Sequence, residues 1–446
     1  LSLDVRLDGF DTPIGALRRS ARGALSFAYA PSHLALSNAR PLSLSMPLRE
    51  KPFNDPATRA FFDNLLQERD GGLDQVLARE GLARDDIAGI LYHIGKDCPG
   101  ALSVLPEGAP PAKIPGDYRR DYRPYSPREI EAIAESLFER SALPENATDP
   151  SPLAGVRSKL ALTLLPDGCL AEPSPGSGAP TTHILKSPSR RVRDEMRFEA
   201  AALDLSRTLG FETAKAQLVT IAGLDLLLIT RFDRSLDEAG RIVRLHQEDF
   251  AQALGLSPAL KYERRGTEGK RFDAHAIARV LRRTLNPARA RETFVRALLF
   301  DLMIGNVDGH AKNYALLHGD EGAVLAPRYD LAPTRVDASL TEEFAFRIGN
   351  AETLEDLTAG DLDSFAAALG MRSAKSRERF LRAQTRALAA GLCSAFPELD
   401  QHRMKRFADL IGDNVIRLCG ALNLAPPEAT PTRDAFIHKG GGWRTS

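Results

Sequence analysis

One stretch decides the expected fold, and it reads IGNVDGHAKNY from Ile304 to Tyr314. It follows residues 291–304, where apolar side chains recur at a helical period and predict a helix buried on one side. Polar residues that directly follow such a helix lie on a loop held by the core, which favours a functional site over a solvated surface. Within the stretch, Asp308 and Asn313 have the spacing D-x-x-x-x-N.

This spacing is the one in which a kinase catalytic loop places a carboxylate and an amide. Asp308 would receive the proton of the substrate hydroxyl, and Asn313 would hold a magnesium ion. Asp330 follows after room enough for a hairpin that returns a second metal carboxylate to the loop. Magnesium takes a few hard oxygen ligands together with substrate phosphates, so one Asp and one Asn suffice. Taken alone, the spacing also fits ordinary turn residues.

A sheet that precedes this loop supplies a candidate lysine. Strands are expected at 159–164, 182–186, 217–221 and 226–230, with a helix from 195 to 209 between the second and third. This order predicts a small sheet with one helix packed on it. Lys186 ends the second strand; a lysine there is usually solvated, but in a kinase it binds nucleotide phosphates and pairs with a helix Glu. Glu199 is the expected partner, and Glu195 competes for that role.

The amino-acid composition limits the classes of protein to which the chain can belong. The chain has 446 residues, 43% of them apolar and 26% charged, which is typical of a folded protein of more than one domain. Lys and Arg (59) balance Asp and Glu (59), which argues against autonomous binding to DNA or to an anionic membrane. Four dispersed cysteines form no C-x-x-C pair, so neither a zinc ribbon nor a disulfide framework is expected. With no signal peptide and no long apolar run, a cytoplasmic location without membrane contact is expected.

Changes of pattern along the chain predict three parts and an α+β fold class. Short strands and a helix fill the first part, and six prolines between residues 105 and 128 suit a boundary. We expect an N-terminal subdomain at 1–115, a sheet-containing lobe at 126–235 and an all-helical lobe at 236–446. Within the second part, Ser126 and Glu129 predict a capping box at the start of a short helix.

Ordered motifs along nearly the whole chain resemble the HipA-type serine/threonine kinases, toxins of bacterial toxin-antitoxin modules. The matching segments are 61–66, 95–101, 153–159, 184–186, 231–234, 246–250, 304–313 and 329–331. The resemblance implies a protein-kinase-like bilobal fold, with an extra subdomain in its N-terminal part. It also implies that ATP and Mg²⁺ are the cofactors.

The resemblance implies roles for individual residues. Asp308 becomes the catalytic base, and Asn313 and Asp330 the magnesium ligands. The residues implied in nucleotide binding are Lys186, His310 and Lys312 for the phosphates, Thr230 and Phe232 at the hinge that meets adenine, Asp233 near the ribose, and Gly155 in the phosphate loop.

Two positions depart from the family pattern. The serine that the family autophosphorylates falls here on Pro152, so Ser151 is the candidate for autophosphorylation. The alternative is complete loss of self-modification. Thr230 stands where some members have Glu, and little effect is expected because a hinge binds adenine mainly through backbone groups.

By resemblance, the chain is a growth-arresting kinase whose substrate is a translation component such as an aminoacyl-tRNA synthetase. A helix-turn-helix antitoxin of the HipB type would neutralise it and connect it indirectly to operator DNA. One alternative is a small-molecule phosphotransferase, against which the extra subdomain argues. Another is a catalytically idle co-repressor partner, against which the intact Lys186, Asp308, Asn313 and Asp330 argue. The basic runs at 190–193 and 261–265 are expected to be solvated faces or, with a partner, to touch DNA.

Overall fold

The computed structural model describes residues 1–66, 71–144, 159–396, 399 and 404–428. The chain divides into two compact units. The first unit comprises Leu1–Arg197, Ala214–Ala259 and Ala315–Ala326, and the second comprises Phe198–Thr213, Leu260–Tyr314 and Pro327–Ser446. Among the described residues, no helix combines the length and the apolar character that crossing a membrane requires.

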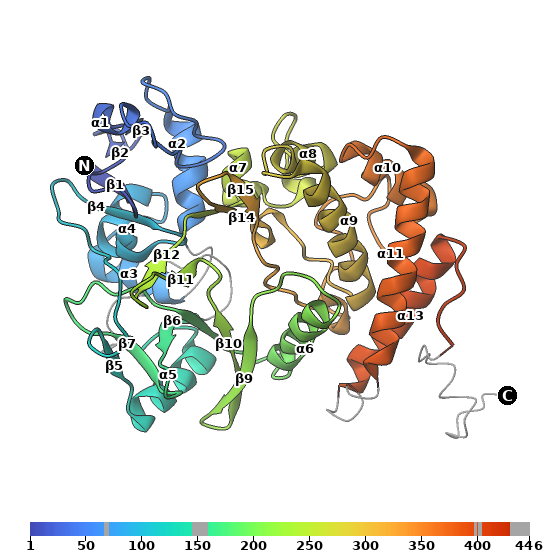
Figure 1. Ribbon diagram of the computed structural model, residues 1–446. Coiled ribbons are helices and arrows are strands. Elements are labelled where there is room, and N and C mark those ends of the chain that lie inside the picture. The colour runs from blue at the N-terminus through green and yellow to red at the C-terminus, as the bar shows by residue number, and fades with distance from the viewer. Residues whose placement is uncertain (67–70, 145–158, 397–398, 400–403, 429–446) are drawn as a thin grey trace. The chain divides into compact units, whose positions relative to one another are not determined.

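A four-stranded antiparallel sheet with the order β3-β2-β1-β4 forms the N-terminal part of the first unit (Figure 1). Its strands are β1 (Ser2–Leu7), β2 (Gly15–Arg19), β3 (Leu25–Tyr29) and β4 (Leu102–Pro106). Alternate residues of β1 are buried, as its period-two pattern requires. A Cβ on Gly15 would lie 2.4 Å from the carbonyl oxygen of Ala28, so the β2–β3 pairing needs glycine at this position.

Helices complete the core of this N-terminal sheet. They are α1 (Pro31–Leu34), α2 (Asp55–Phe62), α3 (Gly71–Glu80) and α4 (Ile87–Ile94). Phe61 and Phe62 of α2 are fully buried and belong to the same cluster as Phe27 of β3. The first part of the chain therefore contains a helix among its strands, as expected, and α2 continues into a 3-10 turn at Asp63–Leu65.

A six-stranded sheet with the order β5-β7-β6-β8-β10-β9 forms the rest of the first unit's main framework. Its strands are β5 (Tyr122–Pro124), β6 (Lys159–Leu164), β7 (Leu170–Pro173), β8 (His183–Lys186), β9 (Ala216–Ile221) and β10 (Leu224–Thr230). The four predicted strands are confirmed as β6, β8, β9 and β10. The strand β8 is flanked by β6 and β10, and Lys186 is opposite Lys159 and Leu227.

The helix that shares this sheet's core is α5 (Pro127–Arg140), in place of the one predicted. It begins with the predicted Ser126–Glu129 capping box, and Ile133 and Leu137 join the sheet residues Leu160 and Leu185 in one core cluster. The predicted helix at 195–209 is α6 (Glu195–Thr208) and belongs from Phe198 onward to the second unit. The prediction used the order of elements from residue 159 onward, and it chose the wrong helix because α5 comes before β6 in the chain.

The expectation that residues 236–446 are all helical is wrong for four short strands and for the last residue of a fifth. They are β11 (Arg234–Leu236), β12 (Ile242–Arg244), β13 (Gln247–Asp249), β14 (Ala315–His318) and β15 (Ala323–Leu325). β11 pairs with β12, and β14 lies between β13 and β15. The short helix α7 (Phe250–Leu254) follows β13 directly in the chain. Strands of three or four residues show too little alternation to be read from sequence. These segments belong to the first unit.

The described residues of the second unit contain helices, 3-10 turns and irregular segments. The longer helices besides α6 are α8 (Ala274–Leu281), α9 (Pro287–Ile304), α10 (Ala359–Ala368), α11 (Ala374–Ser394) and α13 (Lys405–Ala421). α9 packs against α11 and α13, and the three lie side by side in Figure 1. The predicted helix at 291–304 is confirmed as part of α9. The mixed sheet and helix content agrees with the expected α+β class.

Candidate active site

The loop that follows α9 is held in place by the core, as its sequence predicts. Gly305 ends the helix in the left-handed conformation, with φ of 74°. Asn306 then donates from Nδ2 to Asp301 Oδ1 at 3.2 Å, back onto the helix. Beyond it, Val307 accepts a backbone hydrogen bond from Ala345 at 3.1 Å. Asp308 is therefore carried on a loop fixed to two separate segments of the second unit.

The structure brings the two predicted metal ligands into direct contact. Asn313, in the 3-10 turn Ala311–Asn313, donates from Nδ2 to Asp330 Oδ2 at 2.6 Å. Its Oδ1 accepts from the backbone N–H of His310 at 3.2 Å. Asp330 has φ of 54°, a left-handed conformation that is uncommon for a residue other than glycine and is often found at functional sites.

The donor set of this pair fits magnesium. A side-chain amide and a carboxylate offer hard oxygens, which Mg²⁺ prefers, and substrate phosphates and water complete such sites. Among the described residues, no group of three or more His, Cys, Asp or Glu side chains is arranged to hold a metal.

His310 and Lys312 lie in the same loop and are both more than nine-tenths buried. Burial, together with the positive charge of Lys261, lowers the pKa of His310 to about 3. Burial therefore favours the neutral form of this imidazole. The carbonyl oxygen of Lys312 accepts a hydrogen bond from the hydroxyl of Tyr329 at 2.7 Å. This bond ties the loop to the segment that carries Asp330.

A buried ion pair anchors the segment that leads to Asp330. The guanidinium of Arg328 donates to the carboxylate of Asp301 on α9. It also lies 4.9 Å from the ring centres of Phe211 and Phe300. Burial raises the pKa of Asp301, and the charge of Arg328 opposes that rise. Sequence reasoning missed this pair, because nothing in the local sequence connects positions 301 and 328.

Sequence reasoning also missed Tyr262. Its hydroxyl donates to Asp308 Oδ1 at 2.8 Å, and its ring meets the ring of His310 edge to face with centres 5.2 Å apart. The residue lies in the segment 261–265, which in the sequence shows only a basic run. A tyrosine among lysines and arginines gives no sign in sequence that it contacts a distant aspartate.

The predicted nucleotide-binding residues of the first unit lie on and after two neighbouring strands. Lys186, at the end of β8, is only 6% exposed, which excludes the ordinary solvated lysine. Thr230, at the end of β10, has its hydroxyl 3.2 Å from His183 Nε2. Phe232 is half-buried. Arg231, between them, donates from its backbone N–H to the carbonyl of Thr182 at 2.9 Å.

Asp233 lies in a buried network of charges. Oδ1 accepts from Arg231 Nε at 3.0 Å, and Oδ2 accepts from Arg231 Nη2 at 2.9 Å and from the backbone N–H of Gly100 at 2.8 Å. Burial alone would raise the pKa of Asp233, but Arg231 and Arg234 hold it at about 2. These partners favour a structural role for Asp233, and its contact with a ribose stays a prediction.

The predicted site residues thus fall into two groups. Asp308, His310, Lys312, Asn313 and Asp330 come together in the second unit, and Lys186, Thr230, Phe232 and Asp233 belong to the first. Glu199, the expected partner of Lys186, is fully buried on α6 in the second unit, so that pairing stays a prediction. Gly155 and Ser151 lie outside the described residues.

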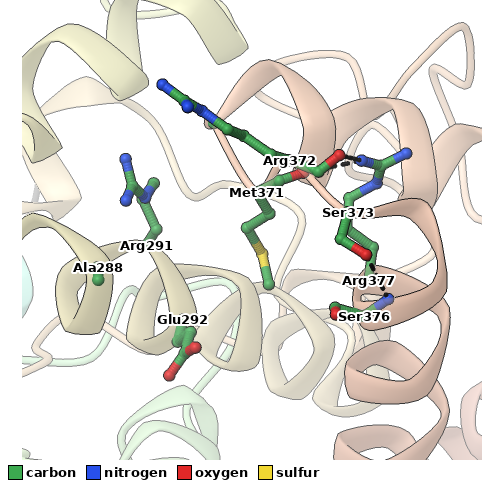
Figure 2. A pocket seen from close by; sticks show the side chains of 9 residues that line it. Ala288, Arg291, Glu292, Met371, Arg372, Ser373, Ser376 and Arg377 are labelled. Atoms are coloured by element: carbon green, nitrogen blue, oxygen red, sulfur yellow. Dashed lines mark hydrogen bonds between the residues drawn. The ribbon is translucent and has the colours of Figure 1, made fainter.

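A surface pocket of about 410 Å³ lies elsewhere in the second unit, between the N-terminal turns of α9 and α11 (Figure 2). Arg291, Arg372 and Arg377 are among its lining residues. Arg377 Nη1 donates to the backbone carbonyls of Met371 and Arg372 at 2.8 and 2.9 Å. None of the predicted site residues lines this pocket.

Comparisons with known proteins identify the family of the chain. The model of the HipA N-terminal domain matches residues 3–105, and the model of the HipA-like C-terminal domain matches residues 151–392. The protein Y4mE of Sinorhizobium fredii, a candidate kinase by its name, is 34% identical over 403 residues, covering 89% of this chain and 94% of that protein. The serine/threonine-protein kinase toxin HipA of Shewanella oneidensis is 28% identical over 347 residues, covering 74% of this chain and 75% of the toxin.

A solved structure shares the fold. It is the complex of HipA, HipB and operator DNA from Shewanella oneidensis, which matches with a TM-score of 0.78 and 23% identity over 95% of this chain and 98% of that one. Two matched family models and a relative above 30% identity along most of the chain establish the family. The chain belongs to the HipA family of kinase-like toxins.

Proposed function

We propose that this protein is an ATP- and Mg²⁺-dependent serine/threonine protein kinase that acts as a growth-arresting toxin. The observation that carries the proposal is the 2.6 Å contact between Asn313 and Asp330 beside the loop of Asp308. A carboxylate for the acceptor hydroxyl and an amide–carboxylate pair for a metal are the parts that phosphoryl transfer requires.

In this proposal, Asp308 holds the acceptor hydroxyl and takes its proton while the acceptor oxygen bonds to the γ-phosphorus of ATP and ADP leaves. Asn313 and Asp330 would hold the magnesium ion, which supplies charge neutralisation at the phosphates. Lys186 and Lys312 add positive charge at the phosphates. His310, in the same loop, would offer a ring nitrogen for hydrogen bonding.

The proposed partner is a helix-turn-helix antitoxin of the HipB type. Support comes from the shared fold with a HipA that was solved with HipB and operator DNA. The formal net charge of zero fits a chain that reaches DNA through a partner. The proposed substrate, a translation component such as an aminoacyl-tRNA synthetase, rests on the family resemblance.

Phosphoproteomics after brief expression tests the proposal and identifies the substrate. The wild type should add phosphate to serine or threonine of a small set of proteins, and Asp308→Asn should lose these sites. This substitution changes the carboxylate to an amide of nearly the same shape, so core volume is kept. Equal phosphorylation by the two proteins would overturn the assignment of Asp308.

Nucleotide binding separates the kinase from a catalytically idle partner of an antitoxin. A kinase should bind ATP more tightly with magnesium than without it, and Asp330→Ala should remove that gain. If ATP does not bind at millimolar concentration with magnesium present, the idle partner is the correct assignment.

A further inference from the structure

We propose that Tyr262 is a positioning residue that holds the carboxylate of Asp308 in the orientation that receives the acceptor hydroxyl. The inference rests on the proposed function, because it assigns Tyr262 to the same phosphoryl-transfer site. Its starting point is the hydrogen bond from the Tyr262 hydroxyl to Asp308 Oδ1, at 2.8 Å.

The backbone on both sides of Tyr262 is fixed. The carbonyl oxygen of Lys261 accepts from Ala311 N–H in the catalytic loop at 3.1 Å. The N–H of Glu263 donates to the carbonyl of Ala345 at 2.9 Å, and Ala345 N–H in turn donates to Val307 at 3.1 Å. The tyrosine is thus joined to the residues on either side of Asp308, which is how a supporting layer of contacts sets the geometry of a functional group.

The ring of Tyr262 is also held. It meets the ring of His310 at 5.2 Å, and the cationic groups of Arg264, Arg265 and Lys261 lie 4.4, 5.4 and 5.4 Å from its centre. Cations near an aromatic face stabilise its position. The carboxylate of Glu263 accepts from the backbone N–H of Arg347 at 2.7 Å, which anchors the segment further.

A hydroxyl held in this way restricts the rotation of the Asp308 carboxylate. Rotation of an aspartate side chain about its last torsion is otherwise broad. A base that is already oriented loses less freedom when the acceptor binds, and small errors in such geometry cost large factors in rate. The hydroxyl therefore acts on the transfer step, whereas the affinity for ATP depends on the groups that bind the phosphates and the metal.

Tyr262→Phe tests the role because it removes the hydroxyl and keeps the ring. We expect kcat for transfer to a protein acceptor to fall about ten- to hundredfold, with the KM for ATP unchanged, since a hydrogen bond to a charged group is lost. The matched control is Tyr118→Phe, a half-buried tyrosine of the first unit, which should leave kcat unchanged. An unchanged kcat in Tyr262→Phe, or a rise in the KM for ATP of the same factor, would overturn the proposal.

A double-variant comparison separates positioning from a general structural effect. If Tyr262 acts through Asp308, Tyr262→Phe should cause little further loss of rate in an Asp308→Asn background. A purely structural role would lower the residual rate by the same factor in both backgrounds, and that result would contradict the proposal.

A readout without turnover keeps this test independent of the proposed function. With 3-fluorotyrosine placed only at position 262, the fluorine resonance should shift when Asp308 becomes Asn and stay in place when the exposed Asp356 becomes Asn. If the fluorine resonance does not shift in Asp308→Asn, the positioning role is overturned even if the protein is an active kinase. If the resonance responds but the wild type transfers no phosphate to any protein, the kinase assignment fails, and the positioning role in transfer fails with it.

Discussion

At the scale of single residues, Asp330 combines a chemical role with an unfavourable backbone conformation. Its φ of 54° costs free energy for any residue with a Cβ, and its carboxylate accepts the hydrogen bond from Asn313. Residues in such conformations persist where the surrounding structure holds them and function needs the side chain. The backbone conformation at this position therefore favours glycine, whereas the proposed activity requires the aspartate carboxylate.

Two substitutions of Asp330 should separate the effect of the backbone conformation on stability from the effect of the carboxylate on activity. Asp330→Ala and Asp330→Gly both remove the carboxylate, and both should reduce phosphoryl transfer by roughly 10²–10⁴-fold. Asp330→Gly should be more stable than Asp330→Ala by about 1 kcal/mol, because glycine adopts positive φ without strain. Urea unfolding and a kinase assay on the same preparations check both. Full activity in either variant would remove Asp330 from the site.

A second residue-scale prediction concerns acid stability. His246 is buried beside His318, and burial first, then the charges of His318, Arg40 and Arg244, lower its pKa to about 3. The unfolded histidine takes up a proton below about pH 6.5 that the folded one takes up only near pH 3, so stability falls as the pH drops through this window. Between pH 7 and pH 5 the loss should be about 2 kcal/mol from this site.

Urea unfolding at pH 7 and pH 5 measures this loss. His246→Gln keeps a side chain that can donate to the carbonyl of Leu42, the present partner of Nε2 at 2.8 Å, but does not titrate. The variant should lose about 2 kcal/mol less than the wild type between the two pH values. The same loss in both proteins would show that His246 is not an acid-sensitive group.

At the scale of elements, the end of α9 decides where the catalytic loop begins. Gly305 turns the chain out of the helix at φ of 74°. A Cβ there would lie 2.7 Å from Leu410 Cδ2 on α13 and 3.2 Å from Arg335 Cβ. The backbone conformation and the close packing both call for glycine at this point. The position of Asp308 therefore depends on how closely α13 packs against the end of α9.

Gly305→Ala should destabilise the protein and lower its activity together. Its matched control is Gly240→Ala, because Gly240 has the same φ of 74° and a Cβ added there would meet nothing within 4 Å beyond its chain neighbours. The control should cost about 1 kcal/mol from backbone strain alone, and Gly305→Ala about 1–3 kcal/mol more from the clash. Thermal unfolding and kcat check this. Equal effects of the two substitutions would refute the packing argument.

At the scale of the whole molecule, the first unit joins parts of the chain that the sequence pattern assigns to separate domains. Asp97, near the end of the N-terminal part, is buried and forms ion pairs with Arg234 and Arg244 at 3.3 and 3.5 Å. Burial would raise its pKa, but Lys113 and the arginines hold the pKa well below its usual range. Breaking one partner of such a buried network is costly, so these parts are expected to unfold together.

The formal net charge of zero leads to a prediction about how tightly the whole chain binds operator DNA. With 59 basic and 59 acidic residues, the isolated protein should bind operator DNA no more tightly than about 10⁻⁶ M at physiological salt. With a HipB-type antitoxin, the complex should reach about 10⁻⁸ M or tighter. Gel shifts at fixed salt, with and without the antitoxin, check this. Tight operator binding by the chain alone would refute the proposed division of labour.

The sequence by itself determined the family, the fold class and most of the long elements. Helices such as α9 and strands such as β8 follow from periodic apolar residues, which are local information. The D-x-x-x-x-N loop and the lysine at the end of β8 could also be identified from the sequence, because they too are local patterns. Their roles in catalysis stay predictions, and so does the role of Ser151.

Only the tertiary structure decided which residues meet. The contact of Asn313 with Asp330, the burial of Lys186, the partners of Asp233 and the hydrogen bond of Tyr262 to Asp308 all join positions far apart in the chain or depend on its packing. The short strands β12 to β15 and the placement of α5 on the sheet also depend on packing between distant segments. Local periodicity states which face of an element is buried, but packing between distant segments selects the partner that covers it.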